Sequence, residues 1–424
     1  MEVERILSTG ERVPEGFAKM IEEMLGKAAD TFFDALCESP SVAIKINRRK
    51  AGSPAAAGYG EGEPVRWCES GIYLEQRPKF TLNPLLHAGV FYVQDPSSMV
   101  YETLASQAME LTGHKGPVVA LDLCAAPGGK STSILNALPD GSLLVANEIV
   151  PARAKVLREN LIKWGYPEVI VTREDSSRLA AGGEQFDLVA VDAPCSGEGM
   201  MRKEPTAATQ WSRRLIEQCA SLQRELLRNA AAMLKPGGVL IYSTCTFNTV
   251  ENEDNLAFAV EELGLESCRA QLPDGTAIGT ELKGDYPALR FMPHLTRGEG
   301  LFAAILRKPG EYLPTADPGR VGKNIAGLTR PILDRIPTTT IKGRLEVPAP
   351  EWPLSTDFPA DFPRVGLTEE EALSYLRHEA LRLPAETPRG YVAVCFNGVP
   401  LGLVKNIGNR ANNLYPSEWR IRHL

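Results

Sequence analysis

The sequence predicts an α/β fold built on a mostly parallel β-sheet that is wrapped by helices. From residue 118 onward, short runs of β-branched residues alternate with helical stretches, the pattern typical of successive strand–helix–strand units. The apolar runs, such as Gly238 to Tyr242, have the length of a strand. They fall far short of the roughly 18 residues that a membrane-spanning helix needs.

Composition narrows the class of protein further. At roughly 150 residues per domain, a chain of 424 residues suggests about three domains. Apolar residues make up 43% and charged residues 23%, values typical of globular proteins rather than disordered ones. The net charge of −7 argues against coating nucleic acid by bulk positive charge, so any RNA contact must be local. The N-terminus lacks a signal-peptide pattern, and we expect a soluble, cytoplasmic protein.

The strands of the predicted sheet are 118–123, 143–146, 169–172, 186–191 and 239–243, and 301–307 adds a later strand that could close it. The clearest helix lies between the fourth and fifth strands. Its apolar residues step by three or four along one face, which predicts a buried stripe of Leu215, Cys219, Leu222, Leu226, Ala230 and Met233. The run Lys235-Pro236-Gly237-Gly238 should end this helix and turn the chain into the next strand.

The regions on either side of the sheet have different patterns. Residues 1–90 contain helices and a strand at 42–47, which ends in the basic run Arg48-Arg49-Lys50. Residues 309–364 are rich in proline and predict a linker that carries short structured pieces.

Residues 365–424 predict a small α+β domain. Thr368 with Glu371 is a capping-box pattern for a helix to about Arg382, and Asn397-Gly398 between two apolar runs predicts a hairpin. From residue 388 onward the single acid, Glu418, is outnumbered by Arg389, Lys405, Arg410, Arg420 and Arg422. This domain is locally basic in an acidic protein.

A ligand loop follows the first strand. The small residues of Cys124 to Lys130 allow a ligand to approach the backbone beside the N-terminus of the next helix. Glu148 ends the second strand, where an acid can hold the hydroxyls of a ribose. Asp175 and Asp192 follow the third and fourth strands. One such acid is more often a helix cap, but three in succession favour a ligand-binding edge.

A phosphate-binding P-loop is the main alternative for this loop. Gly129-Lys130-Ser131 nearly completes that motif, and 186–192 resembles a strand that ends in a magnesium-binding Asp. However, Cys124 stands where the motif requires glycine, and Pro127 lacks an amide donor for phosphate. A nucleoside ligand with a positive sulfonium, S-adenosylmethionine, suits this acidic edge better. A nucleotide-hydrolysing protein with magnesium remains the alternative.

Two cysteines stand just after parallel strands, Cys195 in Asp192-Ala-Pro-Cys-Ser-Gly and Cys245 in Ser243-Thr-Cys-Thr. Both thiols should therefore face one cleft, with polar neighbours that expose them as candidate nucleophiles. The remaining cysteines outside the loop predict small buried side chains and no metal site: Cys37, Cys68, Cys219, Cys268 and Cys395.

A thiolate in this position suits methylation of a pyrimidine ring. Carbon 5 of the ring is a poor nucleophile until a thiolate adds to carbon 6. Asp192 could assist at ring nitrogen 3 if burial or neighbouring acids let it keep its proton, and the second cysteine could assist product release. A non-catalytic RNA-binding module is the other alternative.

Five motifs in order give the chain a family resemblance between about residues 90 and 308: FYVQDPSS (91–98), LDLCAAPGGKST (121–132), NEIVPAR (147–153), VDAPCSGEGM (191–200) and YSTCTFNTVENE (242–253). The chain resembles the Sun-type RNA cytosine-5 methyltransferases, and its basic tail resembles the bacterial RsmF-like branch. The resemblance implies a Rossmann-like class I methyltransferase core with a mostly parallel seven-stranded sheet at 91–308. It also implies an N-terminal α+β RNA-binding region at 1–90 and a C-terminal PUA-like α+β domain at 365–424.

The resemblance also implies the roles of individual residues. Cys245 would be the nucleophile, Cys195 the release cysteine and Asp192 the contact to the base, with Lys130 in the catalytic set. S-adenosylmethionine would be bound by Cys124, Ala125, Ala126, Pro127, Gly128, Gly129, Lys130, Glu148, Arg153, Asp175 and Asp192. The implied substrate is small-subunit (16S) ribosomal RNA, acted on by a monomer without a metal or a membrane. The target base must leave its stack, and Arg48, Arg49, Lys50 and the basic tail should contact phosphates.

Overall fold

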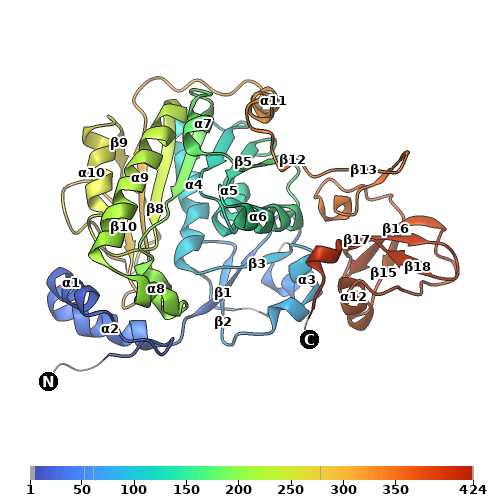
Figure 1. Cartoon of the computed structure of the whole chain (residues 1–424). Coiled ribbons are helices and arrows are strands. Elements are labelled where there is room, and N and C mark those ends of the chain that lie inside the picture. Colours follow the sequence, from blue (N-terminus) through green and yellow to red (C-terminus); the bar gives the residue numbers. More distant parts are fainter. Residues whose placement is uncertain (1–4, 52, 61, 277, 423–424) are drawn as a thin grey trace.

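A mixed β-sheet forms the centre of the computed structural model, which describes residues 5–51, 53–60, 62–276 and 278–422. Within these residues the sheet has nine strands in the order β10-β11-β8-β7-β4-β5-β6-β12, with β9 paired to β11 (Figure 1). The strands are β4 (Val119–Asp122), β5 (Leu143–Asn147), β6 (Val169–Thr172), β7 (Phe186–Asp192), β8 (Leu234–Thr244), β9 (Glu266–Cys268), β10 (Leu289–Phe291), β11 (Leu301–Arg307) and β12 (Leu333–Asp334). Six strands were predicted by range and the resemblance implied a seven-stranded sheet; β9, β10 and β12 lie outside the predicted ranges.

The central strands are parallel, as predicted, and the outer strands are antiparallel. Strands β6, β5, β4, β7 and β8 pair in parallel, whereas β11 and β12 pair antiparallel to β8 and β6. Alternate residues of each strand point to opposite faces, so both faces are apolar and both are covered by helices. The helices of the core are α4 (Val100–Thr112), α5 (Gly129–Ala137), α6 (Pro151–Trp164), α7 (Ser176–Ala180), α8 (Pro205–Gln210), α9 (Arg213–Met233) and α10 (Glu253–Glu261).

The two faces of the sheet belong to two separate clusters of buried side chains. Ala120 and Leu144 pack with residues of α4, α5 and α6, whereas Val119 and Leu143 pack with residues of α7, α9 and α10. The core is therefore a three-layer sandwich whose sheet edges remain free to carry a site.

The predicted stripe of helix α9 is correct in its second half. Leu226, Ala230 and Met233 are buried as predicted, whereas Leu222 is 43% exposed and Leu215 and Cys219 are only partly buried. In the first half Ile216, Ala220 and Gln223 are buried instead, and the Gln223 amide donates to the carbonyl of Pro194. The predicted turn at 235–238 is also absent as a separate element, since these residues form an irregular start of β8.

The N-terminal region combines two helices and a small sheet. Helices α1 (Glu15–Leu25) and α2 (Ala29–Cys37) precede a sheet of order β2-β1-β3, formed by β1 (Val42–Ile46), β2 (Gly71–Leu74) and β3 (Phe91–Val93). Helix α3 (Pro84–His87) follows β2 in this region. Strand β3 lies just beyond the predicted boundary at residue 90 and pairs with β1.

The proline-rich segment 309–364 is docked against the core along part of its length. Helix α11 (Pro318–Thr329) buries Ile325 in the cluster beneath α7, and β12 pairs with β6 at the edge of the sheet. A hairpin of β13 (Thr339–Lys342) and β14 (Leu345–Pro348) comes next. The segment thus extends the central sheet as well as connecting two domains.

The C-terminal domain has a sheet of order β15-β16-β17-β18 and one helix, as expected for a small α+β unit. Its elements are β15 (Arg364–Gly366), α12 (Glu369–Leu376), β16 (Gly390–Phe396), β17 (Val399–Asn406) and β18 (Ala411–Asn413). The capping box of Thr368 and Glu371 is confirmed. The hairpin at Asn397-Gly398 is also confirmed, and both of its turn residues have a positive φ. The helix ends earlier than predicted, at Leu376.

The C-terminal domain packs beside α3 and α6, and α1 and α2 lie at the opposite end of the molecule (Figure 1). Gly165, which follows α6, has a φ of 88° and lies against the carbonyl of Leu354. Tyr375 and Trp419 are buried in the same cluster of side chains as Trp164. No helix in the described part of the chain is long and apolar enough to cross a membrane.

Candidate active site

The predicted site residues come to one edge of the sheet. Strand β4 lies between β5 and β7, so the strand order reverses direction at β4, and open α/β sheets bind ligands at the carboxyl end of such a point. The loop from Cys124 to Gly128 follows β4, and Glu148 follows β5. Asp192 ends β7, and Cys245 directly follows β8.

The two cysteines are brought together by the pairing of β7 with β8. Asp192 is the register partner of Ser243, so the loops that leave both strands start side by side. The Sγ atoms of Cys195 and Cys245 are 3.3 Å apart, and both side chains are partly buried. One thiol can therefore donate a hydrogen bond to the other sulfur.

The environment of Cys195 disfavours its thiolate. The contact with Cys245 and the burial of the side chain raise the pKa of Cys195 well above its usual value. Either sulfur can donate the hydrogen bond between them. Because a thiol is a weaker nucleophile than a thiolate, Cys195 is the poorer candidate for the nucleophile and Cys245 the better one.

Asp192 is held by two partners. Its Oδ2 accepts a hydrogen bond from the Lys130 ammonium at 2.8 Å, and its Oδ1 accepts one from the Ser243 hydroxyl at 2.7 Å. The Tyr101 hydroxyl lies 2.7 Å from that of Ser243. Burial opposes the charge of Lys130, but the Asp192 carboxylate outweighs it, and the pKa of Lys130 is raised.

This ion pair bears on the predicted role of Asp192 at the base. That role depended on burial or neighbouring acids letting Asp192 keep its proton, and it remains a prediction. Lys130, whose ammonium lies 2.8 Å from the Asp192 carboxylate, is a second group that can present a proton to a bound base.

The loop after β4 forms one wall of a pocket. Gly128, with a φ of 112°, precedes α5, and a Cβ atom at Gly129 would come within 3.3 Å of Tyr92 and Gln94. The pocket measures about 190 Å³ and is lined in part by Tyr92, Gln94, Cys124, Pro127, Lys130 and Asp192. Neither polar atom of the buried Gln94 amide has a hydrogen-bond partner within the described residues. The pocket therefore offers a free donor and a free acceptor to a ligand.

No role was predicted for Tyr92 or Gln94 from the sequence. Both belong to the FYVQDPSS motif, which supports the family resemblance but gave no indication of a ligand contact. Their strand belongs to the N-terminal sheet, so no pattern within the core could place them against the loop.

Glu148 and Arg153 support the loop from the next strand. The Glu148 carboxylate is buried, accepts a hydrogen bond from the backbone of Val150 at 2.9 Å, and lies 3.3 Å from the Arg153 guanidinium. Arg153 also donates to the carbonyl of Ala126 at 2.9 Å. Arg153 thus connects the acid to the loop.

Asp175 stands apart from this group in its contacts. Its side chain is exposed and accepts a hydrogen bond from the backbone of Ser177 at 2.9 Å, which caps α7. These hydrogen bonds lower the pKa of Asp175. Its place in the ligand site remains a prediction. The described residues include no group of three or more His, Cys, Asp or Glu side chains that could hold a metal ion.

The basic run after β1 is paired within the chain. Arg48 pairs with Glu69 and Glu102, and Arg49 pairs with Asp140. Lys50 donates to two backbone carbonyls, of Ala88 at 2.8 Å and of Lys163 at 2.6 Å. A contact of these residues with phosphate remains a prediction, and for Lys50 two of the three N–H groups are already used.

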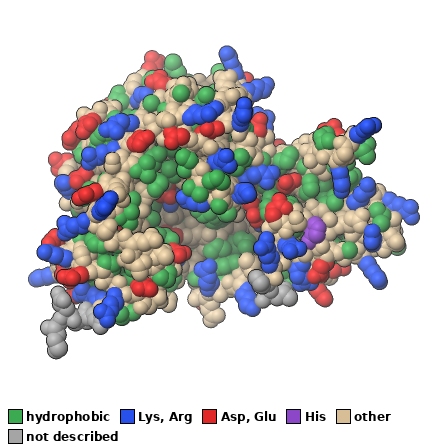
Figure 2. Space-filling model, viewed as in Figure 1, with side chains coloured by type: hydrophobic (Ala, Val, Ile, Leu, Met, Phe, Trp, Pro, Cys, Tyr) green, Lys and Arg blue, Asp and Glu red, His purple; other side chains and the backbone are tan. Residues whose placement is uncertain are grey.

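The basic residues of the C-terminal domain are exposed, in contrast: Arg389, Lys405, Arg410, Arg420 and Arg422. Figure 2 shows a hollow near the middle of the molecule, with lysine and arginine side chains at its rim. Several of these side chains lie on the side of the C-terminal domain.

A ligand loop at the point of strand reversal, beside a polar edge, is the arrangement of Rossmann-like folds that bind a nucleoside cofactor. Three family models match the chain: the 16S rRNA methyltransferase RsmB/F model at 108–307, the N-terminal domain of RsmF at 13–96 and the RsmF PUA domain at 362–421. Ribosomal RNA small subunit methyltransferase F of Cronobacter sakazakii is 32% identical over 96% of both chains.

Two further comparisons agree with this one. The protein of the same name from Pectobacterium atrosepticum is 37% identical over 69% of this chain and 62% of its own length. The solved structure of a methyltransferase homologue from Pyrococcus horikoshii is 26% identical, with a TM-score of 0.58 over 70% of this chain and 95% of the other. The chain belongs to the RsmF family of 16S ribosomal RNA methyltransferases.

Family membership confirms several predictions made from the sequence: the resemblance, the Rossmann-like core, the C-terminal PUA domain and enzymatic activity on ribosomal RNA. It also sets aside both alternatives, the nucleotide-hydrolysing P-loop protein and the non-catalytic RNA-binding module.

Proposed function

We propose that this protein transfers a methyl group from S-adenosylmethionine to carbon 5 of a cytosine in 16S ribosomal RNA. The reaction passes through a covalent bond between Cys245 and the base. The observation that carries the proposal is the 3.3 Å contact of two thiols at the sheet edge that also holds the ligand loop. A reaction with one nucleophile needs no second thiol, so the close pair favours a reaction in which one thiol attacks the base and the other assists release.

The pocket beside Lys130 suits S-adenosylmethionine. A Cβ atom at Gly129 would narrow this pocket, and the unpaired amide of Gln94 is available to a polar ligand. The residues that would hold the cofactor are Cys124 to Lys130, Glu148, Arg153, Asp175 and Asp192, now joined by Tyr92 and Gln94. When bound, S-adenosylmethionine supplies the methyl group.

The first step activates the base. The Cys245 thiolate adds to carbon 6 of cytosine, forming a carbon–sulfur bond, and the electrons of the carbon 5–carbon 6 double bond shift toward nitrogen 3. Lys130 and Asp192 compensate this charge by delivering a proton to nitrogen 3. Carbon 5 then carries the electron density of an enamine and can attack the methyl group.

The second step releases the product. Bond formation between Cys245 and carbon removes the negative charge beside Cys195, which is one of the causes that raise the pKa of Cys195. Cys195 can then give its proton to water and accept the proton from carbon 5. The electrons of the broken carbon–hydrogen bond restore the double bond and expel Cys245 as a thiolate, and nitrogen 3 returns its proton to the Lys130–Asp192 pair.

Recognition of the substrate falls to other parts of the chain. The target base must be flipped out of its stack or taken from a loop to reach Cys245. The exposed basic residues of the C-terminal domain are placed to contact phosphates. We propose that the enzyme acts in the cytoplasm as a monomer.

Substitution of the two cysteines tests the proposal. Cys245→Ala should abolish methyl transfer to small-subunit RNA, whereas Cys195→Ala should leave protein covalently bound to RNA as a slowly migrating band on a denaturing gel. Cys219→Ala is a matched control, since this partly buried thiol lies on α9 outside the site and its loss should change neither readout. Turnover by Cys245→Ala would contradict the assignment of the nucleophile. Bisulfite sequencing of the product would identify the modified cytosine.

A further inference from the structure

The two loops that carry the thiols are joined by a reciprocal exchange of carboxylates. Glu251 follows Cys245 along the chain, and its carboxylate reaches across to the loop of Cys195. Glu198 follows Cys195, and its carboxylate reaches across to the loop of Cys245. Both side chains are fully buried. We call Glu198 and Glu251 the reciprocal carboxylates.

Glu251 holds the residue that follows Cys195. Its Oε2 accepts a hydrogen bond from the backbone of Ser196 at 3.0 Å, and its Oε1 accepts one from the Ser196 hydroxyl. Gln223 of α9 donates to the same carboxylate at 2.7 Å, and Asn248 donates at 2.8 Å. These contacts explain why the polar Gln223 is buried in the first half of α9.

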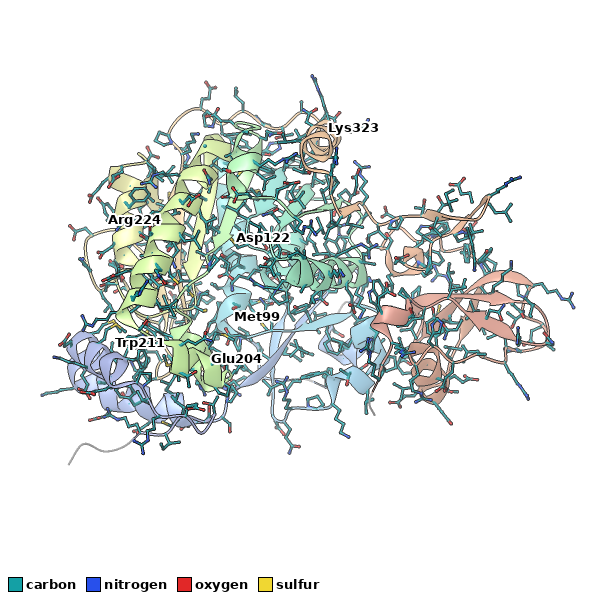
Figure 3. All side chains as sticks on the ribbon, viewed as in Figure 1. Met99, Asp122, Glu204, Trp211, Arg224 and Lys323 are labelled. Carbon is teal, nitrogen blue, oxygen red and sulfur yellow. The ribbon has the colours of Figure 1, made fainter. Side chains whose placement is uncertain are left out.

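Glu198 holds the residues that follow Cys245. Its Oε2 accepts hydrogen bonds from the backbone of Phe247 at 2.7 Å and of Asn248 at 3.0 Å. Its Oε1 accepts one from the Trp211 indole at 3.0 Å, and Figure 3 shows Trp211 below the end of α9, close to the N-terminal helices. The ring of Trp211 packs edge-on against Phe17 of α1, with ring centroids 5.9 Å apart.

A direct backbone contact completes the connection. The amide of Gly199 donates to the carbonyl of Cys245 at 2.8 Å, and a side chain at Gly199 would meet that carbonyl at 2.9 Å. Hydrogen bonds to buried charges are stronger than neutral ones and restrict the geometry of both partners. The reciprocal carboxylates are thus placed to fix the relative position of two loops that share no covalent link nearby.

We propose that Glu198 and Glu251 are positioning residues that set the distance between the thiols of Cys195 and Cys245. No hydrogen bond joins either carboxylate to either sulfur among the described residues, so their effect on the distance is transmitted through Ser196 and through the backbone at 247–248. The charge of Glu251 also raises the pKa of Cys195. The effect of Glu198 and Glu251 on catalysis rests on the proposed function, in which both sulfurs act on one base. Their effect on the distance between the two sulfurs does not depend on that function.

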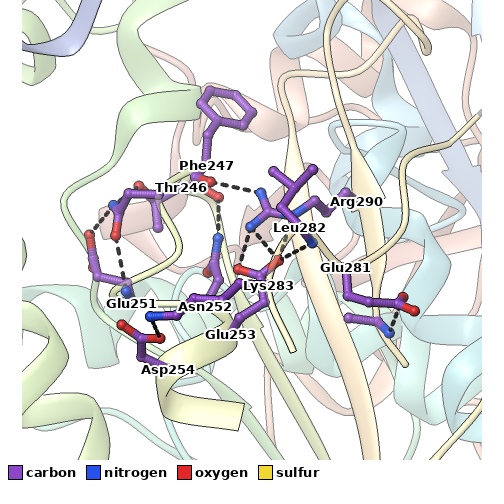
Figure 4. Close-up of polar contacts among 12 residues, drawn as sticks. Thr246, Phe247, Glu251, Asn252, Glu253, Asp254, Glu281, Leu282, Lys283 and Arg290 are labelled. Carbon is purple, nitrogen blue, oxygen red and sulfur yellow. Dashed lines mark hydrogen bonds and ion pairs between the residues drawn. The ribbon is translucent and has the colours of Figure 1, made fainter. Parts of the chain in front are cut away.

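Glu253 provides a matched control on the same segment. It is also buried, and its carboxylate pairs with Arg290 of β10, whose guanidinium also donates to the carbonyl of Phe247 at 2.7 Å (Figure 4). Gln at position 253 can still accept a hydrogen bond from Arg290. Glu253→Gln should therefore cost stability but keep the contact with Phe247, and with it the spacing of the thiols.

Oxidation of the free enzyme measures the distance between the thiols without any methyl transfer. Diamide accepts two electrons and two protons at its nitrogen–nitrogen double bond, while the two thiols lose them and form a disulfide. Peptide mass spectrometry of the full chain gives the rate at which the Cys195–Cys245 disulfide forms. Glu198→Gln and Glu251→Gln should slow this rate by about tenfold or more, because a small misplacement of reacting atoms has effects of this size. Glu253→Gln should match the wild type.

The outcome that overturns the proposal is disulfide formation at the wild-type rate in folded Glu198→Gln and Glu251→Gln variants. If these variants do not fold, Ser196→Ala removes a donor to Glu251 without removing a charge, and a slower rate supports the proposal whereas an unchanged rate overturns it. In the double variant Ser196→Ala/Glu251→Gln, the slowing should be no greater than in Glu251→Gln alone. Additive slowing would contradict a shared contact.

Enzyme kinetics separate this proposal from the proposed function. Glu251→Gln should lower kcat by about tenfold or more and leave the KM for S-adenosylmethionine unchanged, because Glu251 lies outside the cofactor pocket. A loss of stability alone would lower the active fraction without changing the oxidation rate of the folded protein. Methylation by Cys245→Ala would defeat the proposed function and leave the oxidation result intact.

Discussion

Asp122 is a buried carboxyl group at the ligand-binding edge of the sheet, and the burial of its charge lowers the stability of the folded protein. It ends β4, directly before the ligand loop, and lies at the centre of the molecule (Figure 3). Its Oδ2 accepts a hydrogen bond from the Ser131 hydroxyl at 2.6 Å, whereas its Oδ1 has no partner among the described residues. Burial raises the pKa of Asp122 to about 7, and the Asp192 carboxylate adds to this.

The raised pKa of Asp122 predicts a pH-dependent stability. An unfolded Asp ionises near pH 4, so between about pH 4 and pH 7 the folded state binds more protons than the unfolded state. The free energy of unfolding should therefore fall as pH rises through this range, by up to about 4 kcal/mol. Asp122→Asn does not titrate, and it should gain stability relative to the wild type between pH 4.5 and pH 8 in urea denaturation.

Asp175→Asn is the control with the opposite sign. The pKa of Asp175 is lowered by its hydrogen bonds to Ser177, so its contribution is present at neutral pH and is lost on acidification. Relative to the wild type, this variant should be less stable at pH 7, and the difference should shrink toward pH 3. A difference between Asp122→Asn and the wild type that does not change with pH would contradict the assignment of the titration to Asp122.

At the scale of elements, the N-terminal sheet supports the helix that follows the ligand loop. Lys45 of β1 is fully buried, and its ammonium donates to the carbonyl of Gly129 at 2.7 Å and to the hydroxyls of Thr132 at 2.8 Å and Ser133. These are residues of the first turns of α5. A strand that the core does not contain thus orients the start of the helix beside the pocket.

Lys45→Met should therefore weaken binding of S-adenosylmethionine. The methionine fills a similar volume but cannot hold the carbonyl of Gly129 or the two hydroxyls. Burial lowers the pKa of Lys45 to about 7, so we expect the dissociation constant to rise about tenfold, as for the loss of hydrogen bonds rather than of a full charge. Isothermal titration calorimetry measures the change. Lys155→Met, on the exposed face of α6, is the control. Unchanged affinity in Lys45→Met would show that α5 keeps its position without this lysine.

Sequence patterns predicted elements better than they predicted contacts between elements. The bounds of β6 and β11 match their predictions because β-branched and apolar runs mark a buried strand locally. The contacts of Glu198, Glu251 and Lys45 could not be predicted, because each joins segments that only the folded chain brings together. The first half of the buried stripe of α9 was misplaced for the same reason, since periodicity alone gives no ground for burying Gln223, whereas Leu226, Ala230 and Met233 are buried as predicted.

At the scale of the whole molecule, one close contact helps to fix the C-terminal part of the chain on the core. A Cβ atom at Gly165 would lie 2.1 Å from the carbonyl oxygen of Leu354, which belongs to the segment leading to the C-terminal domain. The amide of Thr356 also donates to the carbonyl of Gly165 at 2.8 Å. The backbones at the junction approach too closely for any residue with a side chain.

Gly165→Ala should destabilise the protein more than Gly113→Ala does. Both glycines end a helix with a left-handed backbone, at φ 88° and 68°, so alanine costs about 1–2 kcal/mol at either position. Gly113 has open space around its Cα, whereas the clash at Gly165 should add about 1–3 kcal/mol. Thermal denaturation of both variants measures the difference, and equal losses would mean that the junction adapts without strain.

Strand β12 has a consequence for anyone who shortens this chain. Its two residues shield the amides and carbonyls of β6, which is otherwise the last strand on that side of the sheet. A chain cut after residue 308 would leave this row of hydrogen-bonding groups bare, and a bare strand invites pairing with another molecule. An isolated catalytic domain should therefore aggregate unless the short strand beyond its apparent end is retained.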